Sequence, residues 1–283
     1  VDSHSTIWQN GNWTINGEVN ITNSTVRMNG TEDGFVGINV TPSGWLVVNE
    51  SSNITNGDLG AAEYFFVVQA GSNFSMDNSI LSECGWESTI NRQGLEIYND
   101  AIITSSNFIN NYIGITYYVG NNTLIGSSFI SNTVAGVEIY AATNITIKNY
   151  NSSGSQYGLS TFYPSTNINI SNFKMFDHAQ GLYLNGCSNS IFINGIVGRS
   201  YQNHGINFEG GSNNQFNNVS SIDNSEYGVK FVSNANNNTF TSCNFINNSF
   251  GGVYFDDSFG SDPESNYFYN NISIMMSQVY QLI

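Results

Sequence analysis

Positively charged residues are scarce in this sequence of 283 residues, which has only six Lys and Arg against 21 Asp and Glu. The formal net charge is therefore −15. Proteins bind nucleic acids and anionic membranes through clustered Lys and Arg side chains, which attract phosphate groups. The charge balance disfavours both partners, so we expect neither nucleic-acid binding nor direct membrane insertion.

Proline and cysteine are also rare, with three residues of each. Few prolines beside 28 glycines and 46 asparagines indicate an ordered polar repeat rather than a disordered chain. Cys84, Cys187 and Cys243 show no Cys-x-x-Cys spacing, so we expect buried free thiols. The sequence also has no membrane-spanning stretch and no signal peptide, which favours a processed secreted protein or a fragment without its anchor.

A short phrase recurs through the chain: a glycine, an aliphatic residue, any residue, then usually a second apolar residue. Successive glycines are 20, 22, 22, 23, 24, 23 and 24 residues apart. Such a period indicates stacked supersecondary units. The glycines are Gly94, Gly114, Gly136, Gly158, Gly181, Gly205, Gly228 and Gly252.

Each repeat contains three short apolar alternations, which predict three half-buried strands. After Gly205 the apolar positions are Ile206 and Phe208, then Phe216 and Val219, then Ile222. No repeat contains the 3.6-period stripe of a helix, which excludes a leucine-rich repeat. The pattern therefore predicts an all-β, single-stranded parallel β-helix with about twelve coils of 20–24 residues.

Asparagines recur where the chain must turn between strands. This residue tolerates the left-handed conformation of a tight corner, and stacked asparagines hydrogen-bond along a solenoid axis. We therefore interpret most of them as corner residues rather than ligands. One set is Asn122, Asn144, Asn167, Asn189, Asn214 and Asn238, and a second is Asn111, Asn132, Asn224 and Asn248.

With these repeats the chain resembles the pectin-lyase-like right-handed parallel β-helix superfamily over roughly residues 35–272. In particular it looks like repeat-rich surface proteins of archaea, of the sheath or surface-layer type. Parallel crossovers are right-handed almost without exception, so we expect a right-handed coil. The fold hosts lyases, hydrolases, adhesins and wall proteins, so the resemblance does not settle activity.

We expect one β-helix domain over residues 1–283. Residues 1–93 are predicted to form less regular coils, residues 94–252 regular coils, and residues 253–283 a last coil with an apolar tail. The tail residues are Ile272, Ile274, Met275, Met276, Val279, Tyr280, Leu282 and Ile283. A β-helix end exposes unpaired strand edges, so this tail is predicted either to cap its own end or to pair with another subunit.

Outward positions follow from the alternation on the first strand of each coil. The side chains two residues after each glycine include Glu96, Glu138 and Lys230. Four residues after successive glycines come aromatic rings, which we expect to stack as a stabilising ladder, a sugar platform or a subunit contact. These are Tyr98, Tyr118, Tyr140 and Phe162.

Sixteen Asn-x-Ser/Thr sequons are present, and seven of them fall in the first 53 residues. This density suggests a glycan-coated N-terminal region, provided that the protein is secreted and the turns are exposed. The sequons are Asn12, Asn20, Asn23, Asn29, Asn39, Asn49, Asn53, Asn73, Asn121, Asn144, Asn151, Asn169, Asn218, Asn237, Asn247 and Asn271.

Groups suited to catalysis are few. Pectate-lyase-like chemistry needs carboxylates that bind calcium beside a cationic base, and polygalacturonase-like hydrolysis needs neighbouring aspartates. The cations fall at different coil positions, without an aligned acidic trio, and Asp256 and Asp257 have no aspartate in line on a neighbouring coil. The cations are Arg27, Arg92, Lys148, Lys174, Arg199 and Lys230.

Two smaller clusters of side chains are candidates for a functional site. His178, His204 and Glu226, with Asp177 nearby, precede successive glycines and suit metal binding or proton transfer. The acidic loop 256–264 is interpreted as solvated, with calcium as the alternative cofactor. Its carboxylates are Asp256, Asp257, Asp262 and Glu264.

These observations predict a secreted, extracellular structural protein without enzymatic activity: a self-assembling subunit of a sheath, surface layer or filament. Its partners would be copies of itself, with surface glycans as an addition. The alternative is a carbohydrate-active enzyme, a polysaccharide lyase or hydrolase, or a carbohydrate-binding β-helix. A third interpretation is metal handling at His178 and His204.

Overall fold

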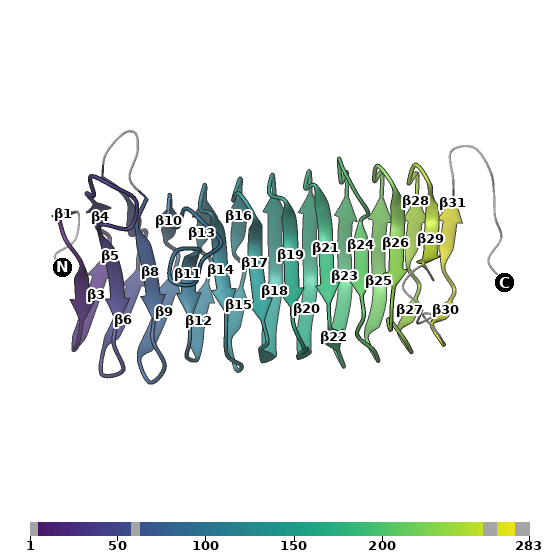
Figure 1. Cartoon of the computed structure of the whole chain (residues 1–283), viewed down its shortest axis with the longest axis horizontal. Helices are drawn as coiled ribbons and strands as arrows, with labels where there is room; N and C mark the ends of the chain where they lie inside the picture. Colours follow the sequence, from purple (N-terminus) through teal and green to yellow (C-terminus); the bar gives the residue numbers. More distant parts are fainter. Residues whose placement is uncertain (1–4, 58–62, 257–264, 275–283) are drawn as a thin grey trace. The chain divides into compact units, whose positions relative to one another are not determined.

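The structure, a computed structural model, describes residues 5–57, 63–256 and 265–274. Among these residues every regular element is a β-strand, and the strands pair in parallel. The chain forms two compact units, Val1–Glu138 and Ile139–Ile283, here called the N-terminal and C-terminal units. Within each unit successive coils follow one another in chain order (Figure 1). The predicted parallel β-helix is thus confirmed.

Each coil of the N-terminal unit contributes one strand to each of three faces. The first face consists of β2 (Trp13–Ile15), β5 (Gly37–Val40), β8 (Phe65–Val68), β11 (Gly94–Ile97) and β14 (Ile113–Tyr117). The second face consists of β3 (Glu18–Thr22), β6 (Trp45–Asn49), β9 (Asn73–Asp77), β12 (Ala101–Thr104) and β15 (Thr123–Ile125). The third face consists of β1 (Thr6–Gln9), β4 (Thr25–Met28), β7 (Asn53–Asn56), β10 (Ile80–Ser82), β13 (Asn107–Ile109) and β16 (Ser128–Ile130). Strand β17 (Ala135–Tyr140) contains the division between the units.

The C-terminal unit keeps the first face but merges the second and third strands of several coils. Its first face consists of β19 (Tyr157–Phe162), β21 (Gln180–Asn185), β24 (Ile206–Glu209), β26 (Tyr227–Val232) and β29 (Gly251–Asp256). The merged strands are β18 (Thr143–Ser153), β20 (Ser165–Phe176), β23 (Ile191–Gly198) and β25 (Gln215–Ile222), with β22 (Cys187–Ser188) paired to β20. Later coils separate again into β27 (Thr239–Thr241), β28 (Asn244–Ile246), β30 (Tyr267–Tyr269) and β31 (Ile272–Ile274).

The merged strands bend at asparagines in the left-handed region. Asn149, Asn172, Asn194 and Asn218 have φ between 52° and 55°. The amide of Asn172 donates to Asn149 at 3.1 Å, and that of Asn218 donates to Asn194 at 3.0 Å. Asparagine allows this φ and still offers a hydrogen bond to the next coil. At each bend two consecutive side chains point outward, as Lys148 and Asn149 do in β18, and the same strand then continues along the next face.

Buried asparagines line other corners, as the sequence predicts. Asn111 donates to Asn132 at 3.0 Å, and Asn224 donates to Asn248 at 2.7 Å. All four are at most 1% exposed. A buried amide that satisfies backbone groups in adjacent coils fixes the spacing of those coils, because an unpaired buried polar group is costly.

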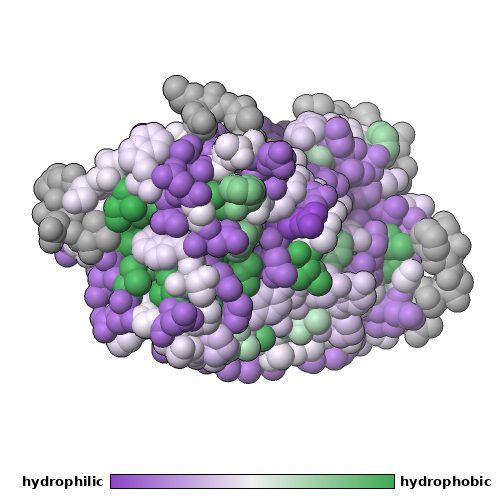
Figure 2. All heavy atoms as spheres, turned by 60° about the vertical axis from the view of Figure 1, so that its left-hand side comes forward, coloured by the Kyte–Doolittle hydropathy of each residue, from purple (hydrophilic) through white to green (hydrophobic). Residues whose placement is uncertain are grey.

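The interior is apolar in both units, with more aromatic stacking in the C-terminal one. There Phe216 stacks on Phe192 at 4.3 Å and on Phe240 at 4.6 Å, and Phe231 stacks on Phe208 at 5.0 Å. Outside this core, apolar side chains lie in small patches between polar ones on the surface shown in Figure 2. The three cysteines are buried free thiols, as predicted. Among the described residues the structure has no helix of the length and apolarity needed to cross a membrane.

Candidate active site

The first face of the C-terminal unit positions a group of polar side chains on adjacent coils. Asn207 of β24, Lys230 of β26 and Tyr254 of β29 occupy equivalent register positions, because Asn207 pairs with Lys230 and Lys230 with Tyr254. Side chains alternate across a strand, and these three follow core residues, so they project outward. Strand register thus gathers residues that lie 23 or more positions apart in the sequence.

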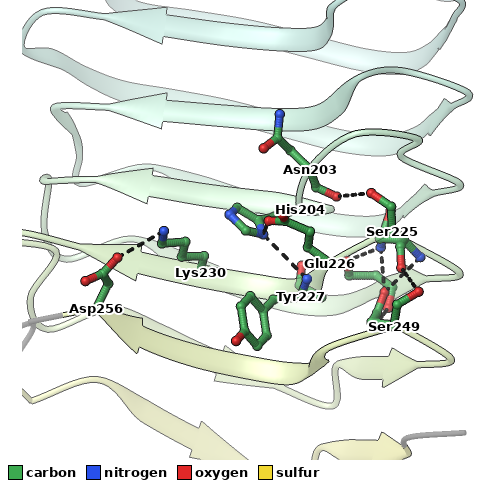
Figure 3. Close-up of polar contacts among 12 residues, drawn as sticks. Asn203, His204, Ser225, Glu226, Tyr227, Lys230, Ser249 and Asp256 are labelled. Carbon is green, nitrogen blue, oxygen red and sulfur yellow. Dashed lines mark hydrogen bonds and ion pairs between the residues drawn. The ribbon is translucent and has the colours of Figure 1, made fainter. Parts of the chain in front are cut away.

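His204 lies at the corner just before β24 and is only 5% exposed. Its Nδ1 atom is 3.0 Å from Oε2 of Glu226 (Figure 3). The Tyr227 backbone N–H also points to Nδ1, at 3.5 Å. The carboxylate contact is shorter, so we assign the proton to Nδ1, donated to Glu226. This tautomer leaves the Nε2 lone pair available as a base.

The imidazole is neutral near pH 7. Burial, with a smaller contribution from the Lys230 ammonium, lowers the pKa of His204 from 6.5 to about 4, against the opposing effect of Asp256. Both causes disfavour the imidazolium, since a cation loses hydration when buried and is repelled by a neighbouring cation. His204 is therefore an unprotonated base under ordinary conditions.

Lys230 is held by Asp256, with Nζ 3.0 Å from Oδ2 (Figure 3). The ammonium also lies 5.8 Å from the centre of the Tyr254 ring. Tyr254 in turn stacks on Tyr227 at 4.6 Å. The group therefore combines a base, a fixed cation and two stacked phenols within neighbouring coils.

Asn207 adds an acceptor to this group. The residue is 7% exposed, and its Oδ1 atom is a buried oxygen with no hydrogen-bond partner in the described part of the chain. Buried side-chain oxygens are normally paired, so this oxygen is an exception among the described side chains.

The structure separates the histidines that the sequence grouped together. His178 accepts the Ser155 backbone N–H at Nδ1, at 3.1 Å, and contacts the Ser152 hydroxyl at 3.0 Å. It is fully buried, and its pKa is lowered to about 4 mainly by burial. Asp177 pairs instead with Arg199 at 2.7 Å. Within the described residues, no three His, Cys, Asp or Glu side chains form a group suited to a metal ion.

Rings of the predicted aromatic column make contacts with aromatic neighbours in each unit. Tyr98 and Tyr118 stack at 4.4 Å in the N-terminal unit. In the C-terminal unit Tyr140 lies 4.7 Å from Tyr163, and Phe162 lies 5.4 Å from Tyr183. The role of these rings as a contact surface stays a prediction.

Glu96 and Glu138 are predicted as outward positions, but both are buried, at 0% and 6% exposure. The segment between β10 and β11 folds over the first face, and Glu96 accepts the Gln93 backbone N–H at 3.2 Å and the Tyr98 hydroxyl at 3.0 Å. Burial raises the pKa of both carboxyl groups, and repulsion from Glu96 helps to bring that of Glu138 to about 7. Glu96 therefore serves to hold this segment.

Several other predicted sites are only partly described. All ten sequon asparagines up to residue 144 are exposed or half-buried, and glycosylation stays a prediction. Ile272 is 51% exposed in β31, whereas tail residues 275–283 lie outside the described residues. So do Asp257, Asp262 and Glu264 of the predicted calcium loop, while Asp256 pairs with Lys230.

Residues 93–273 match a protein family described as "Right handed beta helix region". Among solved structures, the chain is similar to the periplasmic alginate epimerase AlgG, with TM-score 0.64 and 14% identity over 96% of this chain and 73% of that one. A mutant of AlgG gives TM-score 0.65 at 14% identity, over 96% of this chain and 77% of that one. The A-module of mannuronan C-5 epimerase AlgE6 from Azotobacter vinelandii gives 0.48 at 12% identity, over 98% and 92%. Among curated proteins, none matches the sequence significantly.

The family match confirms the predicted right-handed coil. It does not extend to the narrower resemblance to archaeal sheath and surface-layer proteins, which no comparison supports. The prediction of a structural subunit without enzymatic activity is wrong: the similar solved structures of AlgG are those of an alginate epimerase, a carbohydrate-active enzyme. In the sequence the charged groups of the candidate site do not align at one coil position, so they do not indicate a site. Lys230 and Asp256 lie at different positions after their glycines and still pair across adjacent coils.

Proposed function

The chain belongs to the right-handed β-helix family, and on this premise we propose that it is a carbohydrate-active enzyme. A polysaccharide would bind across the outward surface of the first face in the C-terminal unit, and His204 would act as general base. A polymeric substrate of this kind is met outside the cytoplasm, so the proposal includes secretion or display at the cell surface.

The observation that carries the proposal is the His204–Glu226 pair. A base must be unprotonated and oriented, and here the lowered pKa supplies the first condition while the 3.0 Å contact to Glu226 supplies the second. His178 shows the arrangement of a structural histidine, because both of its ring nitrogens contact serines. His204 instead directs Nδ1 to a carboxylate that is 30% exposed.

Stacked phenols beside an unpaired amide oxygen suit a sugar. Pyranose rings present an apolar face that packs on aromatic rings, and their hydroxyl groups donate hydrogen bonds. Tyr227 and Tyr254 offer the rings, and Asn207 offers the acceptor. The surface therefore meets both needs of a carbohydrate ligand within three coils.

The charge of the group favours a neutral polysaccharide. Glu226 beside His204 and Asp256 beside Lys230 carry two carboxylates around one ammonium, and the chain as a whole has a net charge of −15. A polyuronate would meet net repulsion on such a surface. On a neutral polymer no carboxylate activates a ring proton, so the reaction would be hydrolysis. His204 would take a proton from water as the water oxygen attacks the anomeric carbon, and the leaving glycosidic oxygen would take a proton from the Lys230 ammonium as its bond to that carbon breaks.

Product analysis tests this function. The protein is incubated with neutral and acidic polysaccharides, and reducing ends, unsaturated sugars and sugar configuration are measured. Hydrolysis predicts new reducing ends from a neutral polymer, lost in His204→Ala. If the protein acted only on acidic polymers and produced unsaturated or epimerised sugars, the proposed substrate and the proposed reaction would both be wrong. Binding without turnover in every case would leave a carbohydrate-binding protein instead.

A further inference from the structure

The N-terminal unit contains a pocket that is separate from the candidate active site. It is an open pocket of about 540 Å³ over strands β5 and β8 of the first face. Its floor includes the outward side chains Asn39, Val67 and Gln69, and Phe65 lines one side. The segment 86–92 forms the opposite wall, with Trp86 as its largest side chain. The volume is in the range of small-molecule sites.

The wall is built by hydrogen bonds within a short stretch of chain. Trp86 N donates to the Arg92 carbonyl at 2.8 Å, and Arg92 N donates to the Thr89 carbonyl at 3.0 Å. The Gln93 side chain donates to the Ser88 carbonyl at 2.8 Å. Together with the buried Glu96, which accepts the Gln93 N–H, these bonds hold the wall in place over the face. The pocket is thus preformed, which lowers the entropic cost of binding.

The lining combines an aromatic wall with paired amides. Trp86 packs so closely on Gly34 that a Cβ there would come within 2.3 Å of the indole ring. Asn39 Oδ1 accepts a hydrogen bond from Gln69 Nε2 at 2.8 Å, which fixes both amides on the floor. Amides so arranged still offer one donor and one acceptor each, and these match adjacent hydroxyl groups of a sugar ring.

The charges around the pocket disfavour an acidic ligand. Asp33 lines it, and Glu63 lies close enough for Asp33 to raise its pKa, which burial brings to about 7. The cation of the lining is Arg92, whose guanidinium is paired with Glu87 and lies 5.8 Å from the Trp86 ring centre. Even with Glu63 partly protonated, the carboxylates of Asp33 and Glu87 outnumber the Arg92 guanidinium, so a uronate or phosphate group would be repelled.

We propose that this pocket, the Trp86 pocket, is a binding site for a neutral sugar residue of a glycan chain. The sugar packs on Trp86 and Phe65, and its hydroxyl groups bind Asn39 and Gln69. The site needs none of the residues around His204, so it stands whether or not the chain has catalytic activity.

The test measures binding of hexasaccharides to the full chain by calorimetry and tryptophan fluorescence. The probes are laminarihexaose, mannohexaose and xylohexaose as neutral glycans, with an oligogalacturonate of equal length as the acidic one. We expect at least one neutral probe to bind, and Trp86→Ala to weaken its binding about tenfold or more, as for an aromatic anchor. Trp45→Ala is the matched control, since Trp45 is 47% exposed on β6 and does not line the pocket.

Two further variants keep the outcome decisive. Gln69→Ala removes a floor amide without altering the wall and is expected to weaken binding about threefold to tenfold. His204→Ala should leave unchanged the part of the binding that Trp86→Ala removes, which separates the Trp86 pocket from the proposed active site. The proposal is overturned if no neutral probe binds, if oligogalacturonate binds more tightly than all of them, or if Gln69→Ala binds as the wild type does.

Discussion

The two units bury titratable groups of opposite kinds on the same scaffold. The N-terminal unit buries carboxyl groups, and the pKa of Glu138 is raised to about 7. The C-terminal unit buries imidazoles, and the pKa of His178 and of His204 is lowered to about 4. Burial is the largest cause in each case, because the charged form loses hydration. One physical effect therefore makes the N-terminal side chains acids near neutral pH and the C-terminal ones free bases.

The units also use the first face differently. In the N-terminal unit the segment 85–93 covers Glu96 and leaves a pocket beside it. In the described part of the C-terminal unit, the side chains around Lys230 lie on adjacent coils of this face and contact one another directly. We infer that the N-terminal unit is suited to holding a sugar and the C-terminal unit to chemistry. The following predictions test this contrast.

The largest expected effect is on catalysis by His204. Replacing it with alanine removes the base and should lower the turnover of the substrate polysaccharide by about 10²–10⁴-fold. Because the base is active when unprotonated, wild-type activity should persist down to pH 5 and fall as the pH passes through about 4. The measurement is kcat as a function of pH for the wild type and His204→Ala.

His178→Ala serves as the comparison for that variant, since it removes an equally buried imidazole from a corner. It should lower stability while kcat of the folded protein changes little. If the two variants lose equal activity, His204 has only a structural role and the contrast between the histidines is wrong.

A second effect concerns the buried asparagine corners, which are the same in both units. Asn111 accepts the Cys84 N–H at 3.0 Å, and Asn224 accepts the Ser200 N–H at 3.1 Å. Replacing either asparagine with alanine leaves that buried N–H unpaired and breaks the amide contact to the next coil. Each variant should lose about 2–4 kcal/mol of unfolding free energy, measured by denaturant titration.

The exposed bend of the merged strands provides the control. Asn172 has φ 55°, and its side-chain hydrogen bond to the neighbouring coil is exposed to solvent. Glycine adopts the same backbone conformation, so Asn172→Gly should change the unfolding free energy by less than about 1 kcal/mol. An equal loss from the buried and exposed substitutions would show that burial does not set the cost of these corners.

Much of the fold could be predicted from the sequence because every coil repeats the same constraint. A glycine lies at the start of the first-face strand in most of these coils, where the next coil approaches closely: a Cβ on Gly114 would lie 2.4 Å from the Gly136 carbonyl oxygen. Asparagines mark corners where φ is positive. These local requirements recur in each coil, so the period, the strands and the stacked amides are visible without coordinates.

The candidate site could not be predicted in the same way, because it depends on side chains of adjacent coils at different offsets. Lys230 lies two residues after its glycine and Asp256 four residues after the next, and a diagonal contact joins them. Writing both outward columns side by side would have shown this pair. The Trp86 pocket gives no such signal, since the irregular segment 85–93 has no counterpart in the repeat. The same segment covers Glu96, so this side chain is buried although it is predicted to be exposed.

A third prediction follows from the opposite pKa shifts. The pKa of Glu138 is raised from 4.5 to about 7, so its contribution to stability is complete below pH 4.5 and is lost as the pH rises through 7. The pKa of His204 is lowered from 6.5 to about 4. The contribution of this side chain to stability is therefore present above pH 6.5 and is lost as the pH falls through 4. Glu138→Gln should therefore match the wild type near pH 4.5 and exceed it by about 1–3 kcal/mol above pH 7. Denaturant titrations across this range measure the difference, and a constant difference would contradict the shift.

The smallest expected effect distinguishes two tyrosine stacks that look alike. The Tyr98 hydroxyl donates to the buried Glu96 carboxylate at 3.0 Å, so Tyr98→Phe should cost about 1 kcal/mol of unfolding free energy. Tyr254→Phe keeps the stack on Tyr227 and should cost less than about 0.5 kcal/mol. The proposed roles predict the reverse order for activity, because Tyr254 faces the site of chemistry whereas Tyr98 supports a wall. A variant pair in which Tyr98→Phe lowers kcat more than Tyr254→Phe does would assign catalysis to the N-terminal unit.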